Sequence, residues 1–333
     1  MPRALITGVR GQDGRYLAEF LHGKGYEVFG LVHDVRTDDS RVARELPFVQ
    51  LIHGNLTDIG SLIRACEEAR PDEIYNLGSQ SAVDLSFTEP RATLDVTGFG
   101  PVNILETLRI LRATAPNIKF YQASSSEMFG VSSGALPYSE LTEFQPQSPY
   151  AIAKVLGHHA TRMYREAYGI FAATGICFNH ESPRRGQNFV TRKVSVAVAR
   201  IALGLQSKLA LGNLDSRRDW GFAGDYVEAM WLTLQHSEPD DFVISTGESH
   251  SVTEFVELAF SRVGISDWQE YVVQDPRFFR ALDVPDLCGD NSKARSILGW
   301  KPSVRFEQLV TMMVDADLSL IKATVKDADR THN

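Results

Sequence analysis

Short apolar runs alternate with longer segments of helical periodicity in the first half of the chain. The apolar runs are rich in Ile, Val, Leu, Phe and Tyr and read RALITG, YEVFGLV, FVQLIHG, EIYNLG and IKFYQAS. Between them, segments such as RYLAEFLHGKG and ILETLRILRAT repeat apolar residues with the period of an amphipathic helix. Strands that alternate with helices predict right-handed βαβ units and a parallel sheet covered on both faces. The pattern therefore predicts an α/β fold built on a doubly wound parallel sheet.

Glycines follow the first predicted strand at a spacing that suits a dinucleotide. The residues Thr7-Gly8-Val9-Arg10-Gly11-Gln12-Asp13-Gly14 form a GxxGxxG loop between a strand and an amphipathic helix. Gly8 can make the tight turn, Gly11 lets backbone N–H groups approach a pyrophosphate, and Gly14 lets the helix pack on the strand. We therefore expect a Rossmann sheet with a cofactor site that includes Gly8, Gly11, Gln12, Asp13 and Gly14. A glycine-rich turn without a ligand is the alternative.

The residues after the second predicted strand do not decide between NAD and NADP as the cofactor. An acidic residue roughly 20 residues beyond the loop holds the adenosine ribose in NAD enzymes. This region reads His33-Asp34-Val35-Arg36. Asp34 would favour NAD, whereas Arg36 could accept the 2′-phosphate of NADP.

The pattern changes at about Pro183, where arginine-rich loops lead into mixed helices and short strands. Here we expect helices at 191–203 and 252–263, a strand at 208–211, a functional loop at 274–290 and a frayed tail after 325. Two units follow. A dinucleotide-binding domain would span 1–182 and about 225–246, and a smaller C-terminal α/β lobe would span 183–224 and 247–325.

Composition and charge narrow the class of protein. The chain has 333 residues, 43% of them hydrophobic, and no run of about 18 apolar residues, so we expect no membrane span. A net charge of −8 argues against a general nucleic-acid binder. Cys66, Cys177 and Cys288 are widely spaced, no CxxC or HExxH motif indicates a metal, and MPRALITG leaves no room for a signal peptide. We expect a cytoplasmic protein without a metal.

Two motifs predict the chemistry. Tyr150 and Lys154 are four residues apart at the start of a helix, so they share one helix face. A lysine ammonium and a nicotinamide ring would lower the tyrosine pKa towards neutrality, and Tyr150 could then accept a proton from a sugar hydroxyl. The second motif, Ser124-Ser125-Ser126-Glu127, follows the predicted strand IKFYQA. A carboxylate there could remove the C5 proton of a 4-keto sugar, a step that plain hydride transfer lacks; a solvated glutamate is the alternative.

At these motifs the chain resembles the GDP-mannose 4,6-dehydratase family of the extended short-chain dehydrogenases, and the similarity covers nearly the whole sequence. The matching segments are TGVRGQDGRYLAEFL, PDEIYNLGSQS, FYQASSSEMFG, SPYAIAK, FNHESPRRGQNFVTRKV, LGNLDSRRDWGFAGDYVEAMW and LGWKP. The resemblance implies recycled NADP(H), a GDP-mannose substrate held largely by the second lobe, and a homodimer or homotetramer.

The resemblance also assigns roles to individual residues. Catalysis would fall to Ser125, Glu127, Tyr150 and Lys154. The cofactor would contact Arg36, Asn55, Leu56 and Leu77 besides the glycine loop, Tyr150 and Lys154. The nucleotide sugar would contact Asn179, Arg185, Val190, Lys193, Arg218 and Arg280, with Arg218 the expected diphosphate clamp.

The chain departs from the family at four places. Ser125 replaces a threonine, which keeps the hydroxyl but loses a methyl that stiffens the rotamer. His33-Asp34 replaces a pair of arginines, so NAD stays possible as the cofactor. Asn55 replaces an adenine-contacting aspartate, and Ala281 and Asp283 replace a proline and a glutamate near Arg280.

Three other functions use parts of the same pattern. A GDP-sugar 4-epimerase or reductase would need the loop and the Tyr150/Lys154 pair but not Glu127. A dehydratase of a related GDP-hexose or heptose would need all of them. A binding or regulatory protein could keep the fold without catalysis, although the complete catalytic set argues against it.

Overall fold

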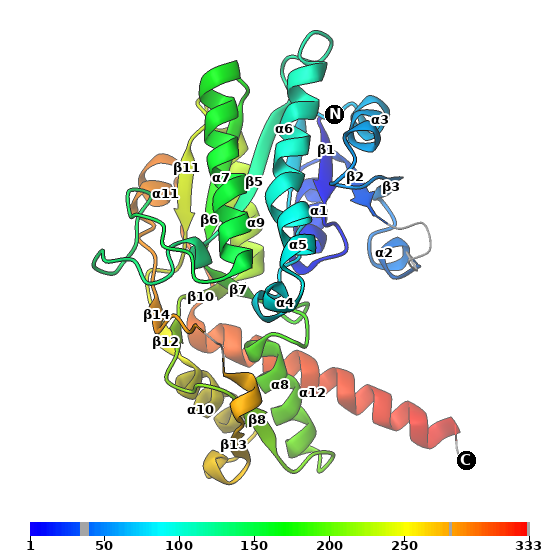
Figure 1. Cartoon of the computed structure of the whole chain (residues 1–333). Helices are drawn as coiled ribbons and strands as arrows, with labels where there is room; N and C mark the ends of the chain where they lie inside the picture. The colour runs from blue at the N-terminus through cyan, green and yellow to red at the C-terminus, as the bar shows by residue number, and fades with distance from the viewer. Residues whose placement is uncertain (34–39, 280–281, 332–333) are drawn as a thin grey trace.

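A parallel sheet organises the chain. The computed structural model describes residues 1–33, 40–279 and 282–331, without the side chains of 40–41 and 326–331. Within these ranges, seven parallel strands lie in the order β11-β6-β5-β4-β1-β2-β3 (Figure 1). Their bounds are β1 Arg3–Thr7, β2 Glu27–Val32, β3 Gln50–His53, β4 Glu73–Asn76, β5 Lys119–Ser125, β6 Ala172–Cys177 and β11 Asp241–Ile244. The predicted doubly wound Rossmann sheet is confirmed.

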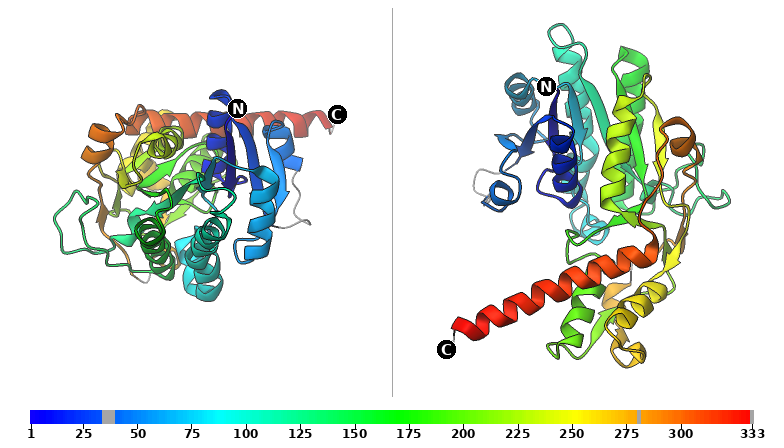
Figure 2. Two further views of the ribbon diagram at one scale, coloured as in Figure 1. Left: turned by 90° about the horizontal axis from the view of Figure 1, so that it is seen from above. Right: turned by 180° about the vertical axis from the view of Figure 1, so that it is seen from behind.

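Helices cover both faces of this sheet, as the view from above in Figure 2 shows. Helices α1 (Gln12–Gly23) and α9 (Ala223–Gln235) pack on one face over an apolar core that includes Leu17 and Met230. Helices α3 (Ile59–Ala69), α6 (Gly100–Leu111) and α7 (Pro149–Tyr168) pack on the other, over a core that includes Leu105. A sheet buried on both faces explains why its strands read as continuous apolar runs.

Shorter elements connect these layers. The helices are α2 (Ser40–Glu45), α4 (Val83–Thr88), α5 (Pro90–Thr93) and α11 (Ser292–Ile297), with a π-helical turn η1 (Leu94–Phe99) and 3₁₀ turns η2 (Ser126–Met128), η3 (Trp268–Glu270) and η4 (Pro276–Phe278). The turn η1 runs directly into α6 and lies against α7.

The order of the strands reverses between β1 and β4, and this places the ligand crevice. From β1 the chain goes outward to β2 and β3, then returns to the other side of β1 at β4. At this point Thr7 and Asn76 join the two strands, since the Thr7 hydroxyl donates to Asn76 Oδ1 over 2.6 Å. Ligands bind outside the carboxyl ends of the strands at such a reversal.

A second group of elements lies below the carboxyl ends of the strands (Figure 1). It contains helices α8 (Val190–Ala202), α10 (Val252–Arg262) and α12 (Phe306–Thr331) around their own apolar core, which includes Trp220 and Phe255. Small sheets pair β10 (Trp220–Phe222) with β7 (Asn179–Glu181), and β13 (Val272–Gln274) with β8 (Leu209–Leu211). A three-stranded sheet has the order β12 (His250–Ser251), β9 (Arg217–Arg218) and β14 (Asp286–Leu287).

The local predictions for this second group are confirmed within one residue at the helix and strand ends. Helices predicted at 191–203 and 252–263 and the strand predicted at 208–211 correspond to α8, α10 and β8. The tail prediction is wrong, because α12 continues through Thr331 instead of fraying after 325 (Figure 2). The start of α12 packs on α8 and α10, which explains why the helix forms there although its last turns are polar.

Candidate active site

A cavity of about 840 Å³ opens at the carboxyl ends of the sheet strands. Its wall comes from the glycine loop before α1, the ends of β4 and β5, the start of α7, strand β7 and the loop that leads into α8. The predicted catalytic residues Ser125, Glu127, Tyr150 and Lys154 all line this one cavity, together with the glycines of the loop. The fold thus brings together groups that are more than 140 residues apart in sequence, such as Gly8 and Lys154.

The glycine loop is shaped for close approach of backbone to a ligand. Gly8 has a φ of 73°, and a Cβ there would lie 2.8 Å from the backbone nitrogen of Gly78. A Cβ at Gly14 would lie 2.3 Å from the carbonyl oxygen of Gly8. Gly11 is the N-cap of α1 and makes no side-chain cap hydrogen bond. The first N–H groups of α1 therefore lie at a bare helix start, which suits a pyrophosphate.

Helix α7 presents the tyrosine and the lysine to the cavity. The Ser148 hydroxyl accepts a hydrogen bond from the Ala151 backbone N–H and Pro149 occupies the first turn, which starts the helix directly before Tyr150. One turn on, the Lys154 ammonium donates to the carbonyl of Ala123 over 2.8 Å and lies 5.6 Å from the centre of the Tyr150 ring. The end of β5 therefore fixes the lysine beside the tyrosine.

Burial dominates the protonation of this pair. It raises the pKa of Tyr150 well above its ordinary value; a hydrogen bond with Ser125 opposes the rise and the Glu127 carboxylate adds to it. Burial also lowers the pKa of Lys154 to about 8. The described side chains alone therefore do not shift the pKa of Tyr150 towards neutrality. A bound nicotinamide ring would add positive charge, which favours the phenolate.

The turn after β5 carries the other two catalytic candidates. Ser125 Oγ accepts a hydrogen bond from the backbone N–H of Glu127 over 3.2 Å, which caps the 3₁₀ turn η2. This cap holds the Ser125 side chain against the turn and places Glu127 at the cavity wall. A hydroxyl, a carboxylate, a phenol and an ammonium thus share one site, which is the set that proton transfer at adjacent sugar carbons requires.

An ion pair that the sequence motifs did not predict closes the cavity on one side. Asp13 Oδ2 lies 2.8 Å from His180 Nε2, and His180 Nδ1 lies 2.7 Å from the Phe178 carbonyl. Burial raises the pKa of Asp13, but the charge and hydrogen bond of His180 outweigh it and the pKa falls to about 2. Gln12 also bridges to β7 by donating to the His180 carbonyl over 3.0 Å.

Two of the predicted nucleotide-sugar contacts line the cavity. Asn179 contributes a buried side-chain oxygen that has no hydrogen-bond partner among the described residues. The Arg185 guanidinium lies 3.7 Å from the centre of the Phe189 ring, and its Nε lies 3.1 Å from Glu181 Oε2. These groups face the same space as Glu127, so the sugar and its phosphates can share that space.

Three other predicted contacts lie away from the walls of this cavity. Val190 begins α8, and the Lys193 ammonium on the same helix lies 3.2 Å from the centre of the Phe278 ring. Arg218 is buried on β9, where its guanidinium donates to the carbonyls of Arg217 and Val284 over 2.7 and 2.8 Å. The predicted Arg280 lies outside the described residues, as does Arg36.

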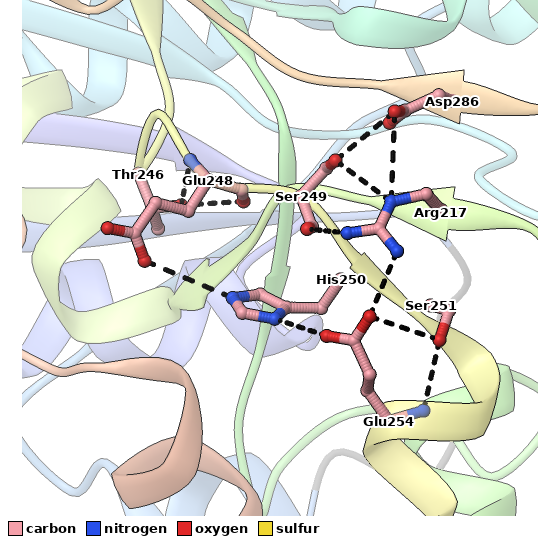
Figure 3. Close-up of polar contacts among 8 residues, drawn as sticks. All are labelled: Arg217, Thr246, Glu248, Ser249, His250, Ser251, Glu254 and Asp286. Carbon is pink, nitrogen blue, oxygen red and sulfur yellow. Dashed lines mark hydrogen bonds and ion pairs between the residues drawn. The ribbon is translucent and has the colours of Figure 1, made fainter.

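The neighbour of Arg218 is held by a separate polar network (Figure 3). Arg217 Nη1 donates to Glu254 Oε1 over 2.9 Å and its Nη2 donates to the Ser249 carbonyl. His250 lies 2.8 Å from Glu254 Oε2, and its ring stacks 3.8 Å from that of Phe306. Strand β9 is therefore anchored on the Arg217 side, which fixes the backbone that carries Arg218.

A second, smaller cavity of about 370 Å³ adjoins the glycine loop. The predicted cofactor contacts Asn55 and Leu56 line it, whereas Leu77 lines the larger cavity. Ser79, Ser81 and Arg192 also line the larger cavity; they lie in segments that carry the family resemblance, but no role was predicted for them. Ser79 lies three residues beyond the end of β4, and this place near a strand end is the signal that could have found it.

In the part of the chain that the structure describes, His, Cys, Asp and Glu side chains do not gather in threes at a spacing that would hold a metal ion. No helix found there combines the length and the apolar character that spanning a membrane requires.

Comparison with known proteins adds to this geometry. Residues 5–313 match the sequence profile of the family described as GDP-mannose 4,6 dehydratase. The chain belongs to this family. The resemblance drawn from the sequence motifs is thereby confirmed.

Members of the GDP-mannose 4,6-dehydratase family from distant organisms align along almost the entire chain. GDP-mannose 4,6 dehydratase 2 of Arabidopsis thaliana is 52% identical over 331 residues, which cover 96% of this chain and 87% of that protein. The Homo sapiens enzyme is 45% identical over 347 residues, covering 96% of this chain and 92% of that protein. The activity expected from the motifs is the one for which these relatives are named.

Among solved structures, UDP-glucose 4-epimerase of Thermus thermophilus in complex with NAD has a similar fold. Its TM-score is 0.82 at 25% identity, with 95% of this chain and 98% of that chain covered. The sheet and the second group of elements are thus shared with enzymes that act on other nucleotide sugars.

Proposed function

We propose that the protein is a GDP-mannose 4,6-dehydratase that converts GDP-mannose to GDP-4-keto-6-deoxymannose and water with a nicotinamide cofactor that is restored in each cycle. The observation that carries this proposal is the position of Glu127 in the same cavity as Tyr150 and Lys154. An oxidoreductase needs the tyrosine and lysine alone, whereas removal of water from C5 and C6 also needs a group that takes the C5 proton.

The residues fit the cofactor at its pyrophosphate and nicotinamide ends. The bare start of α1 and the tight contacts at Gly8 and Gly14 form a cradle that side chains would fill. When bound, the nicotinamide accepts a hydride from C4 of the mannose and returns it to C6. We propose NADP as this cofactor, with NAD the alternative that Asp34 would favour.

Tyr150 takes the proton of the C4 hydroxyl in the first step. Lys154 stands beside its ring, so a protonated lysine stabilises the phenolate that forms when the proton leaves. The 4-ketone then makes the C5 proton acidic, and Glu127 removes it. The C6 hydroxyl leaves as water with a proton from Glu127, and Ser125 holds this hydroxyl in place. Hydride addition at C6 and return to C5 of the proton that Tyr150 took from the C4 hydroxyl would complete the product, so no net oxidation occurs and both residues are restored.

The nucleotide end of the substrate extends from the cavity towards the second group of elements. Asn179 and Arg185 would meet the diphosphate side, because both line the cavity beside the reacting groups. Val190, Lys193, Arg218 and Arg280 would bind the rest of the GDP moiety. We propose that 183–224 and 247–325 form this nucleotide-sugar lobe, and that 1–182 with about 225–246 forms the cofactor domain.

We propose an even-numbered homo-oligomer, supported by exposed apolar side chains, and a cytoplasmic location, supported by the free thiols. Large apolar side chains are about half exposed on η1, α6 and α7, namely Phe99, Ile110, Ile152 and Met163. A second copy of the chain could cover this face, and light scattering of the purified protein tests it. Cys66, Cys177 and Cys288 are free thiols in the described structure, as a reducing compartment requires.

Incubation with GDP-mannose and NADP⁺ in D₂O tests the proposed reaction. We expect loss of one water, one deuterium at C5, and no accumulation of reduced cofactor. Glu127→Gln should still oxidise C4 but release no water, whereas Glu143→Gln, a change at an exposed glutamate, should react like the wild type. Full turnover by Glu127→Gln would contradict the dehydratase mechanism, and inversion at C4 without water loss would favour an epimerase. Parallel assays with other GDP-sugars define the substrate.

A further inference from the structure

Arg10 occupies the junction of the two cavities at the cofactor site. It is the residue before Gly11 in the glycine loop, and it lines both the larger cavity and the smaller one. Arg15 and Arg184 line only the larger one. Arg10 is half-buried, so surrounding residues cover much of it.

The smaller cavity has the character of an adenosine site. It lies beside the carboxyl ends of β2 and β3, and apolar side chains form most of its wall, including Leu31, Val32, Leu56 and Val96. An adenine ring suits such a slot, because it offers two apolar faces and a few polar edges. The pyrophosphate belongs at the start of α1, so the ribose between the two has to lie next to Arg10.

The charge around this ribose position favours a phosphate. The described residues of the smaller cavity include the cation Arg10 and the imidazole of His33, and none of those described residues is an aspartate or a glutamate. In NAD enzymes a carboxylate after the second strand binds the ribose 2′-hydroxyl, and such a carboxylate would repel a 2′-phosphate. An arginine at the same place binds phosphate oxygens with two parallel hydrogen bonds.

We propose that Arg10 is the residue that recognises the 2′-phosphate of NADP(H) and so sets the cofactor preference. This assignment rests on the proposed cofactor site.

The backbone around Arg10 is held in place from both sides, which makes the position specific. Val9 is fully buried, and a Cβ at Gly30 would lie 2.7 Å from one of its methyl groups, so β2 fits closely against this residue. On the other side, the Gly11 N–H donates to the Gly8 carbonyl over 2.9 Å. The backbone that carries Arg10 therefore has little freedom to lose when a ligand binds.

Equilibrium binding to the full-length protein, freed of copurified nucleotide, tests the proposal without an activity measurement. The ligands are NADP⁺ and NAD⁺, and the fragments 2′,5′-ADP and 5′-AMP, which differ only by the 2′-phosphate. We expect the wild type to bind the 2′-phosphorylated member of each pair more tightly. Arg10→Gln should lose roughly tenfold to a hundredfold in affinity for NADP⁺ and 2′,5′-ADP, and keep its affinity for NAD⁺ and 5′-AMP.

Two further variants separate the possible explanations. Arg10→Lys should retain part of the preference, since it keeps the charge but not the guanidinium fork. Arg36→Gln tests the competing assignment, because it removes the same charge from the segment after β2 where NADP enzymes commonly carry their arginine. Unchanged NAD⁺ affinity in each variant shows that the site has folded.

The outcomes distinguish this inference from the cofactor proposal itself. If the wild type binds both members of each pair equally, NADP is the wrong cofactor and the role of Arg10 fails with it. If the wild type prefers the 2′-phosphate and Arg10→Gln keeps that preference, the Arg10 assignment is overturned while NADP stands. A loss confined to Arg36→Gln would likewise overturn it and assign the phosphate to Arg36.

Discussion

Asp13 and His180 join the glycine loop to the substrate side of the cavity through one 2.8 Å contact between Oδ2 and Nε2. Asp13 lies in the first turn of α1, and His180 lies in β7. The His180 ring also stacks on Tyr226 at 4.5 Å, so α9 supports it from behind. The glycine loop and the strand that carries Asn179 are therefore mechanically connected.

The Asp13–His180 contact predicts a loss of stability at alkaline pH. Burial lowers the pKa of His180, but Asp13 outweighs burial and raises it above 6.5. A raised histidine pKa stabilises the fold below the unfolded value, and the contribution is lost as pH rises through the folded value. Thermal melts should therefore show a stability decrease above pH 6.5 that His180→Gln abolishes. That variant should also lower the free energy of unfolding by about 1–3 kcal/mol. An identical pH slope in both proteins would contradict the role of the pair.

The serine at position 125 predicts that one added methyl group, as in Ser125→Thr, increases kcat. The Ser125 hydroxyl is held by the N–H of Glu127, but a serine rotamer is less restricted than that of a threonine. We expect Ser125→Thr to raise kcat by about two- to fivefold with KM unchanged, and Ser125→Ala to lower kcat by about a hundredfold. Steady-state kinetics with GDP-mannose measures both. A Thr variant slower than the wild type would show that the site has no room for the methyl.

The Lys154 ammonium predicts the alkaline limit of the reaction. Burial lowers its pKa to about 8, so the cation beside Tyr150 is lost as pH rises through that value. We expect kcat to fall above pH 8, and Lys154→Met to remove this limb of the profile together with about a thousandfold in rate. Tyr150→Phe should abolish turnover without changing the melting temperature. If kcat of the wild type stays constant from pH 7 to 10, Lys154 is not the group that sets the alkaline limit of the reaction.

The network around Arg217 predicts an effect on substrate affinity without contact to the substrate. Arg217→Gln removes the link to Glu254 and releases β9, which carries Arg218. We expect KM for GDP-mannose to rise about tenfold while kcat changes less than twofold. Glu248→Gln is the control, because this carboxylate is exposed and its distance to His250 is 4.0 Å. Equal effects of the two variants would argue against positioning through Arg217.

A buried ion pair between α8 and α12 predicts that the last helix is part of the fold. Arg192 Nη2 lies 2.6 Å from Asp317 Oδ1, and Asp317 also accepts a hydrogen bond from Ser195. Asp317→Asn leaves Arg192 buried without its counter-charge and should cost about 3–5 kcal/mol in denaturant unfolding. The exposed pair between Arg262 of α10 and Asp315 of α12 provides the control, and Asp315→Asn should leave the unfolding midpoint unchanged. Similar losses in both variants would point to helix propensity instead.

The sequence by itself determined the sheet, the glycine loop and the four residues proposed for catalysis. Buried parallel strands have to be apolar along their whole length, and a tight approach of backbone to pyrophosphate admits only glycine, so both leave a local pattern. Tyr150 and Lys154 are one helical turn apart, and Ser125 and Glu127 end a strand, so their common orientation also follows from local geometry.

Only the tertiary structure decided the relations between distant residues. Asp13 and His180 are 167 residues apart, and nothing local in either segment specifies the other. The rise in the pKa of Tyr150 comes from burial by the assembled fold, and the local spacing of Tyr150 and Lys154 gives no sign of that burial. The assembled fold also decides that Arg218 donates to the Val284 carbonyl. It likewise places Arg10 in the walls of two cavities. Charge, solvation and cavity shape depend on which surfaces meet, and folding, not sequence spacing, brings those surfaces together.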